Sequence, residues 1–279
     1  KLHQDVLEKQ AVITGEWMYP HIYTFNGKQF IEQKSGLEKQ LGWWQTVVAA
    51  DIDNDGDTDL VLGNLGENFY LRASNNAPVK VYLKDFDKNG TIEKIFSHTI
   101  NGEDMPVFLK KDITEQLPAL KKENLKHQDF APKTIQALFP NNLSDATVLT
   151  VNTAASIIAI NNSNKGFTVQ PLPYQLQLSS IQALVVDDIN KDGNKDILAA
   201  GNFFDLLPQF CSIDASYGNL LLGNGKGGFI VAKPQQSGIS INGQIKQVLP
   251  LQVKNQPGYL FLQNNQHPLY LRKTNAGKK

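Results

Sequence analysis

The sequence has little of what would place it in several large protein classes. It contains one cysteine, Cys211, so an intrachain disulfide is excluded and rigidity has to come from packing or bound ions. Its apolar runs, such as 181–186, are far shorter than the roughly 18 residues that a membrane-spanning helix requires. The 27 basic and 27 acidic side chains cancel to a formal net charge of +0, which removes the positive field that nucleic-acid binding usually needs. We therefore expect no nucleic-acid partner and no membrane insertion by this segment.

Recognisable catalytic signatures are also missing. The sequence has no GxSxG elbow and no Cys/His nucleophile pattern, and its five histidines are scattered without metal-binding spacing. Gly223, Gly225 and Gly228 match GxGxxG, but the strand-like residues 229–231 follow them where a dinucleotide site needs a helix. A glycine hairpin is therefore the better interpretation, and we expect a protein that is not an enzyme.

A long series of short strand-like runs fills most of the chain. Runs rich in Val, Ile, Leu, Phe and Tyr, such as 46–50, 60–62 and 183–186, are bounded by Gly, Asn, Asp or Pro. This pattern predicts an all-β fold. The exception is residues 105–140, where apolar side chains follow helical spacing and predict two short helices in an insert between strands.

Internal repetition is the most informative feature of the sequence. Three hairpin-like segments end in Phe30, Phe167 and Phe229. The distance from Phe30 to Asp51 equals that from Phe167 to Asp188, 21 residues, and both aspartates open an acidic loop. Self-similar units of this kind are typical of β-propellers, whose blades need neighbours to cover their faces. We predict about four to five blades' worth of strands, in a partial or small ring.

The spacing of the hairpins also predicts how the blades are distributed. The interval from Phe167 to Phe229 is about one blade, and the longer interval from Phe30 to Phe167 is predicted to hold two blades besides the helical insert. Counting the same 21 residues from Phe229 reaches Pro250, and residues 251–258 then contain no carboxylate. We predict a blade there that binds no metal.

Two acidic loops carry a metal-binding pattern. Residues 51–59 read DIDNDGDTD and residues 188–196 read DINKDGNKD, with oxygen-bearing side chains at loop positions 1, 3, 5 and 9 and glycine at position 6. Ca²⁺ takes about six to eight oxygen ligands, which such side chains, the carbonyl of position 7 and a water would supply. Clustered carboxylates repel one another without a cation, and glycine permits the sharp turn. The predicted calcium residues are Asp51, Asp53, Asp55, Asp57 and Asp59, and Asp188, Asn190, Asp192, Asn194 and Asp196.

Other interpretations of these loops fit less well. An EF-hand needs flanking helices and a glutamate at position 12, where this chain has Leu62 and Ala199. Mg²⁺ prefers to keep several waters. Asp- and Asn-rich turns that bind nothing remain the alternative.

A third loop, DFDKNGTIE at residues 85–93, has the same glycine and the same oxygen positions. It begins 34 residues after the first loop, which is too close for a full blade. A third calcium ion is therefore expected at a different edge of the sheet. Its candidate residues are Asp85, Asp87, Asn89, Thr91 and Glu93.

The two main loops, each preceded by an apolar strand and followed by an apolar-Gly-Asn step at 60–64 and 197–202, resemble FG-GAP (VCBS) repeats. Such repeats build the seven-bladed β-propeller of integrin α subunits and occur in many bacterial surface or secreted proteins. The insert and the third loop are similar to bacterial VCBS proteins of the ASPIC/UnbV-associated type. The resemblance implies one propeller domain over 1–279, calcium between two strands of a blade, and an extracellular, cell-surface or periplasmic location. Seven blades are more than this chain holds, so either blades are missing from it or the ring is smaller. We expect the chain to be part of a longer one.

The leading hypothesis is a bacterial binding or adhesion module in which structural calcium holds the loops while the open faces bind a protein or a glycan. Two alternatives stay open: an enzyme acting on polysaccharide, since propellers often hold active sites in their central channel, or a passive spacer. Trp17, Trp43 and Trp44 would suit sugar stacking if exposed, but large aromatic side chains near strand ends more often pack between blades.

Overall fold

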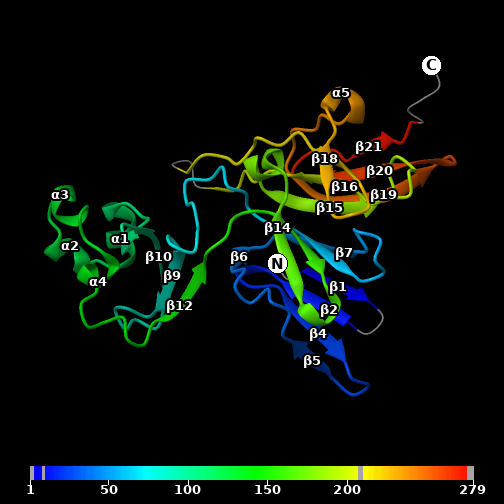
Figure 1. Ribbon diagram of the computed structural model, residues 1–279. Helices are drawn as coiled ribbons and strands as arrows, with labels where there is room; N and C mark the ends of the chain where they lie inside the picture. Colours follow the sequence, from blue (N-terminus) through cyan, green and yellow to red (C-terminus); the bar gives the residue numbers. More distant parts are fainter. Residues whose placement is uncertain (1–2, 8–9, 207–209, 275–279) are drawn as a thin grey trace. The chain divides into compact units, whose positions relative to one another are not determined.

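The computed structural model describes residues 3–7, 10–206 and 210–274 and shows a mostly β protein (Figure 1). The chain divides into two compact units, one formed by residues 1–70 and 154–279 and the other by residues 71–153. The predicted helical insert at 105–140 lies inside the second unit, while the single domain predicted over 1–279 stays a prediction. Within the described ranges, no helix is long and apolar enough to cross a membrane.

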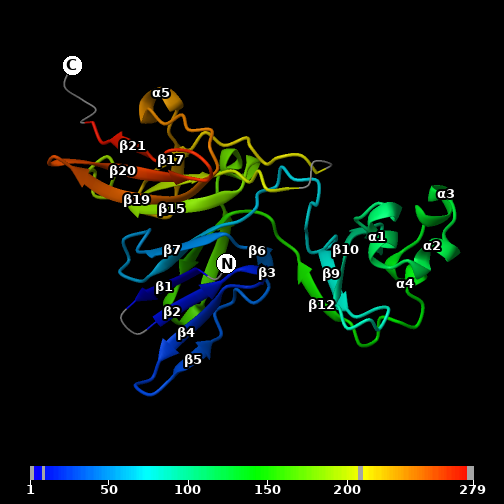
Figure 2. The ribbon, with the colours of Figure 1, turned by 180° about the vertical axis from the view of Figure 1, so that it is seen from behind.

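Four antiparallel sheets of three or four strands, here named A to D, form most of the first unit (Figures 1 and 2). Sheet A contains β1 (His3–Leu7), β2 (Gln10–Thr14), β4 (His21–Phe25) and β5 (Phe30–Gln33). Sheet B contains β7 (Thr46–Ala50), β8 (Asp59–Gly63), β13 (Ile157–Asn161) and β14 (Phe167–Pro171). Sheet C contains β15 (Ile181–Asp187), β16 (Asp196–Gly201), β17 (Asn219–Gly223) and β18 (Phe229–Val231). Sheet D contains β19 (Ile245–Val253), β20 (Gln256–Gln263) and β21 (Leu269–Arg272).

A few short elements lie between the strands of these sheets. The strands β3 (Glu16–Met18) and β6 (Gly42–Trp43) pair with each other. Two 3₁₀ turns, η1 (Ser163–Lys165) and η2 (Tyr174–Leu178), flank β14, and the helix α5 (Pro234–Ser237) follows β18. The three predicted hairpins are confirmed, with β4 paired to β5, β13 to β14 and β17 to β18.

The middle sheets are buried on both faces. In β8, Leu60 and Leu62 pack in a cluster shared with sheet A, whereas Val61 packs in a cluster shared with sheet C. Residues 197–200 of β16 alternate in the same way between sheets B and D. Because successive side chains of a strand point to opposite faces, a strand between two sheets requires a continuous apolar run. The sheets therefore stack in the order A-B-C-D as blades do, but the described residues form no closed ring, and the number of blades stays a prediction.

Sheet B is interrupted by the second unit. Its second strand, β8, ends at Gly63 and its third strand, β13, begins at Ile157, and the second unit occupies the interval between them. The two halves meet again where Leu62 pairs with Ile157. The interval from Phe30 to Phe167 thus contains two four-stranded sheets, sheet B of the first unit and the sheet of the second unit. The two blades predicted there stay a prediction, because the second of these sheets is inserted within the first in the sequence.

The second unit is a four-stranded antiparallel sheet with four short helices. The strand order is β11 (Glu103–Pro106), β10 (Glu93–Ile100), β9 (Val79–Lys84) and β12 (Thr147–Val151). The helices are α1 (Lys110–Gln116), α2 (Ala119–Glu123), α3 (His127–Phe130) and α4 (Ile135–Leu138). Side chains of the helices and the sheet form one buried cluster, which includes Ile95, Ile113 and Ile135. The prediction of two helices in 105–140 is wrong, since the described residues there form four. Pro118 is the reason that α1 and α2 are separate helices, because the residue before a proline disfavours helical geometry.

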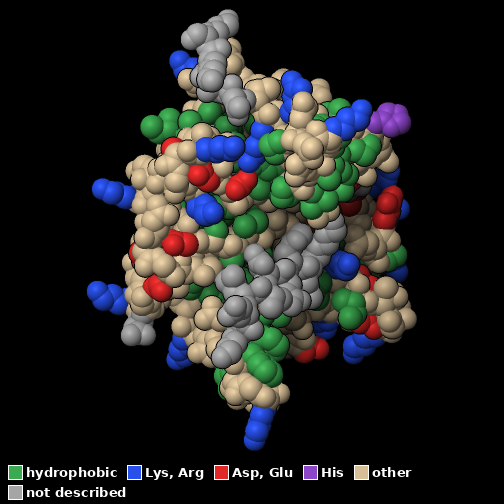
Figure 3. Space-filling view, turned by 90° about the vertical axis from the view of Figure 1, so that its right-hand side faces the viewer, with side chains coloured by type: hydrophobic (Ala, Val, Ile, Leu, Met, Phe, Trp, Pro, Cys, Tyr) green, Lys and Arg blue, Asp and Glu red, His purple; other side chains and the backbone are tan. Residues whose placement is uncertain are grey.

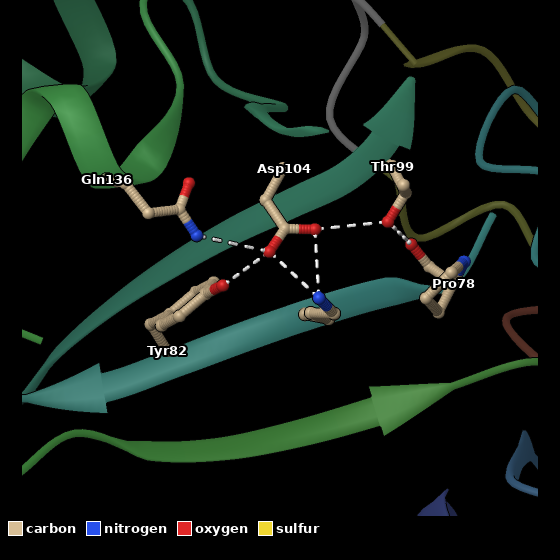
Figure 4. A network of polar contacts seen from close by, with 6 residues as sticks. Pro78, Tyr82, Thr99, Asp104 and Gln136 are labelled. Carbon is tan, nitrogen blue, oxygen red and sulfur yellow. Dashed lines mark hydrogen bonds and ion pairs between the residues drawn. The ribbon is translucent and has the colours of Figure 1, made fainter. Parts of the chain in front are cut away.

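A buried carboxylate ties this sheet together (Figure 4). Asp104 accepts hydrogen bonds from Lys80 Nζ at 2.8 Å, Tyr82 Oη at 2.7 Å, Thr99 Oγ1 at 3.1 Å and Gln136 Nε2 at 3.4 Å. Burial pushes the pKa of Asp104 upward, but the hydrogen bonds, led by that from Lys80, outweigh burial and hold the pKa below its ordinary value.

We predict that Asp104→Asn lowers the free energy of unfolding by roughly 1.5 to 3 kcal/mol at pH 7, since it weakens charge-assisted hydrogen bonds. Because the pKa is lower in the folded state, the contribution of Asp104 is complete above the ordinary carboxyl pKa of about 3.9 and is lost as pH falls through the lowered folded value. Urea unfolding from pH 7 to pH 3 should show the gap between wild type and variant closing below about pH 4. Glu103→Gln, at an exposed neighbour, is the control; an equal loss there would contradict the assignment.

Candidate metal-binding loops

Each acidic loop joins two neighbouring antiparallel strands. Residues 51–58 join β7 to β8, residues 188–195 join β15 to β16, and residues 85–92 join β9 to β10. Strands flank all three loops, as was predicted for the first and second, so an EF-hand is excluded here. The third loop belongs to the inserted sheet and not to another edge of a stacked sheet, which explains its short distance from the first loop in the sequence.

The three loops share one backbone conformation. At position 4, Asn54, Lys88 and Lys191 have left-handed φ values of 62°, 61° and 65°. The glycine at position 6 has φ values of 92°, 88° and 91° in the same order. A positive φ is uncommon for residues other than glycine, so its recurrence at one loop position indicates a specific, repeated turn.

Three hydrogen bonds recur in every loop. The carboxylate at position 1 accepts the N–H of glycine 6 at 3.1, 2.8 and 3.0 Å in the first, third and second loops. The side-chain oxygen at position 5 accepts the N–H of position 7 at 2.8 Å in all three. The carboxylate at position 9 accepts the N–H of position 2 at 2.7, 2.8 and 2.9 Å. The side chains at positions 1, 5 and 9 therefore fold back over their own loop.

In sheets B and C, the position 9 carboxylate also accepts a hydrogen bond from the next strand of the sheet. Asp59 is fully buried, and its second oxygen accepts the N–H of Asn161, at the end of β13, at 2.7 Å. Asp196 is equally buried and accepts the N–H of Gly223, at the end of β17, at 3.0 Å. Burial raises the pKa of Asp59 above its ordinary value, although the hydrogen bonds from Asn161 and Ile52 work in the opposite direction. We call this position 9 carboxylate the clasp, because its hydrogen bonds join the loop to the third strand of its sheet.

Carboxylates converge in the first and third loops. Oxygen atoms of Asp51, Asp53 and Asp59 all lie within 4.8 Å of one another. Asp51 Oδ1 and Asp53 Oδ1 are buried and have no hydrogen-bond partner among the residues that the structure describes. Burial, and then the charge of Asp55, raises the pKa of Asp53. Unsatisfied buried carboxylate oxygens are costly, and a divalent cation with oxygen ligands would satisfy them, so the first loop fits a metal ion.

The third loop repeats the arrangement of the first. Asp85, Asp87 and Glu93 also bring oxygens within 4.8 Å of one another. Asn89 donates to Asp87 Oδ2 at 3.0 Å and its own Oδ1 accepts from Thr91, so Asn89 and Thr91 support the group of carboxylates.

The remaining predicted residues lie around these groups. Asp55 is exposed and accepts the N–H of Asp57, whose carboxylate accepts a hydrogen bond from the Ser163 hydroxyl. In the second loop, Asn190 donates to Asp192 Oδ2 at 2.9 Å, and the backbone N–H of Asn194 lowers the pKa of Asp192. Across the described ranges, groups of three carboxylates occur in the first and third loops but not in the second, where asparagine stands at positions 3 and 7.

Sequence reasoning missed the apolar residue at position 2 of each loop. Ile52 and Phe86 are buried in the cores of their sheets, and Ile189 is partly buried against the core shared by sheets C and D. Their side chains anchor the loops while their N–H groups bind position 9. The recurring pattern DI, DF, DI at the start of the loops was the available signal.

Sheet D has a tight turn where an acidic loop would stand. Lys254 and Asn255, with φ values of 48° and 61°, form the whole connection between β19 and β20. Two left-handed residues are typical of a type I′ hairpin turn. Such a turn is too short to curl several side chains around an ion, and the absence of metal there stays a prediction.

The family comparison matches the part of the chain that contains the first acidic loop and its two flanking strands in sheet B. Residues 43–83 match the family model of the FG-GAP repeat. The matched segment contains β7, the first acidic loop and β8, and then runs into β9 of the second unit. A comparison with curated proteins found no match. The FG-GAP resemblance is thus confirmed for this segment, while the ASPIC/UnbV-associated type stays a prediction.

We predict that Asp59→Ala lowers the free energy of unfolding by roughly 2 to 4 kcal/mol even in EGTA, because the buried N–H of Ile52 and the partly buried N–H of Asn161 lose their acceptor. Asp55→Ala removes an exposed carboxylate of the same loop and should change stability much less under the same conditions. Chemical unfolding of both variants in EGTA gives the comparison. Equal losses would show that Asp59 is not a clasp.

Proposed function

We propose that the chain is a calcium-stabilised β-propeller module that binds a protein or glycan ligand. The observation that carries the proposal is the convergence of Asp51, Asp53 and Asp59 in the FG-GAP segment, with two buried carboxylate oxygens that lack partners among the described residues. Residues 85–93 and 188–196 have the same loop conformation, which supports a metal-binding loop that is repeated along the chain.

Calcium suits the donor set better than other common metals. The converging atoms are all carboxylate oxygens, and hard oxygen ligands favour Ca²⁺ or Mg²⁺ over Zn²⁺ or copper. Mg²⁺ demands near-ideal octahedral geometry and releases water reluctantly, whereas Ca²⁺ accepts the irregular geometry of a curled loop. Asp51, Asp53 and Asp59 would hold the ion, with the carbonyl of Asp57 as a further candidate ligand.

The ion's role would be structural. A cation removes the repulsion within the first loop, and Asp59 links that loop to β13 across the break in sheet B. Asn54 Nδ2 donates to Asn194 Oδ1 at 3.3 Å, so the first loop also touches the second and braces sheet B against sheet C. These two hydrogen bonds fix the positions of the strands in sheets B and C, and so they also fix the opposite ends of the strands, where a ligand would bind.

We predict that calcium raises the melting temperature of the full chain by several degrees relative to EGTA. An ion that binds only the folded state stabilises it by about 2.7 kcal/mol at 100 times its dissociation constant. Differential scanning calorimetry in calcium, magnesium and EGTA provides the test. Superimposable curves in calcium and EGTA would refute the proposal.

A matched pair of variants places the ion in the first loop. Asp53→Asn should weaken the calcium-induced shift and yet stabilise the protein in EGTA, because it removes the charge of a partly buried carboxylate whose buried Oδ1 has no partner among the described residues. Asp214→Asn, an exposed carboxylate outside the acidic loops, should alter neither value. If the calcium-induced shift of the melting temperature were unchanged in Asp53→Asn, the ion would not be bound by the first loop.

FG-GAP repeats are typical of extracellular proteins, and we infer an extracellular, cell-surface or periplasmic location in a bacterium. The face viewed in Figure 3 has acidic and basic side chains interspersed, without a continuous patch of one sign, in keeping with a ligand other than nucleic acid. The alternatives of a polysaccharide-active enzyme and of a passive spacer stay predictions, which activity screening on polysaccharides and ligand-binding assays would separate.

A further inference from the structure

Exposed aromatic side chains gather at one edge of sheets B and C. This edge lies opposite the acidic loops, because Thr46 pairs with Gly63 and Ile181 pairs with Gly201 at the far ends of the strands. Its loops carry four of the six exposed Phe and Tyr side chains in the described ranges: Tyr70 after β8, Tyr174 after β14, Phe204 after β16 and Tyr217 before β17. These four residues are named the aromatic edge. The other two, Phe25 and Phe30, contact each other on the hairpin of sheet A.

Packing among aromatic rings holds part of this edge in position. Tyr70 stacks on Phe210 with ring centroids 4.7 Å apart and planes 5° apart, and Phe69 meets Tyr70 edge-on at 4.6 Å. Phe69 in turn contacts Trp43 at 6.4 Å, and Trp43 contacts Trp17 at 5.6 Å. Trp43 is buried, so the row is anchored in the core. Tyr70 nevertheless remains 43 % exposed, which leaves a rigidly held ring at the surface.

Hydrogen-bonding groups are fixed beside the exposed rings. Asn68, two residues before Tyr70, is exposed and donates to the carbonyl of Leu178 at 3.2 Å. Asp205, next to Phe204, is exposed and accepts from Gln244 Nε2 at 3.0 Å. An amide and a carboxylate that are already oriented lose little further freedom on binding, so they favour a ligand rich in hydroxyl groups.

The composition of the loops narrows the ligand class. The described loop residues 64–70, 172–180, 202–206 and 210–218 contain three acidic residues but no Lys or Arg. The nearby Lys246 Nζ lies 4.0 Å from the carboxylate of Asp205, which offsets its charge. Phosphates, nucleic acids and acidic sugars need basic partners, so they are disfavoured here. Protein interfaces are enriched in Arg and Met as well as in aromatic residues, and these loops contain neither Arg nor Met. Aromatic rings with amide and carboxylate neighbours suit an uncharged carbohydrate, whose C–H faces stack on rings while its hydroxyls form hydrogen bonds.

We propose that the aromatic edge binds an uncharged oligosaccharide. This names the ligand class of the proposed binding module and rests on that proposed function. Tyr70 and Tyr174 follow strands of sheet B, and Phe204 and Tyr217 flank strands of sheet C. Stacked sheets lie about 10 Å apart, so a ligand that contacts rings on both sheets has to span more than one sugar unit.

The test titrates the full chain, in saturating calcium, with hexasaccharides of β-linked glucose, xylose, mannose and N-acetylglucosamine. Isothermal titration calorimetry should detect binding of at least one of them. Tyr70→Ala and Tyr174→Ala should each weaken it by roughly threefold to tenfold, while Tyr70→Phe, which keeps the ring, stays close to wild type. Phe30→Ala removes a ring that is 51 % exposed on sheet A and should leave the affinity unchanged.

Several outcomes would overturn the inference. One is the absence of binding heat with every neutral hexasaccharide. Another is a loss of affinity in Phe30→Ala equal to that in Tyr70→Ala. A third is binding only to hexagalacturonate, the acidic sugar used for comparison, or only to a protein. Melting curves of every variant in calcium and EGTA run in parallel. A normal calcium shift without sugar binding rejects the carbohydrate inference and leaves the proposed module standing, whereas loss of the calcium shift in wild type rejects the module itself. If Tyr70→Ala fails to fold, Tyr174→Ala decides, since Tyr174 is 72 % exposed.

Discussion

Asp59 has no exposed surface, and both of its oxygens accept backbone N–H groups, one from Ile52 inside the loop and one from Asn161 on the next strand. A carboxylate in such a place is costly to bury, and these hydrogen bonds offset the cost only while the loop stays curled. The curled loop in turn brings Asp51 and Asp53 beside Asp59, which creates the repulsion that a cation would remove. Loop, clasp and ion site are therefore one physical unit.

The Asp59 hydrogen bonds also explain how sheet B tolerates a long insertion. Its second and third strands are separated in the sequence by the whole second unit, yet Leu62 still pairs with Ile157 and Asp59 still binds Asn161. The alternating faces of β8 then pack against sheets A and C at once. Loop insertions are tolerated thermodynamically when the flanking strands keep their pairing, because closure entropy grows only slowly with loop length.

Local features of the fold were predictable from the sequence, and long-range pairings were not. Glycine at position 6 and oxygens at positions 1, 5 and 9 act within nine residues, so the loops and the three hairpins could be located by spacing. The pairing of β8 with β13 joins residues about a hundred positions apart, and no local pattern distinguishes an inserted sheet from another blade. The aromatic edge was missed for a related reason, since the exposure of Tyr70 or Tyr174 depends on how distant loops pack.

A crystal structure determined in calcium, with the ions located by anomalous scattering, tests the central claim most directly. The account predicts an ion in the first and third loops, with oxygens of Asp51, Asp53 and Asp59 and of Asp85, Asp87 and Glu93 about 2.3 to 2.6 Å away. It also predicts that Asp59 keeps its hydrogen bond to Asn161. Calcium-saturated crystals with no ion in the first loop, and with Asp51 and Asp53 turned into solvent, would contradict it.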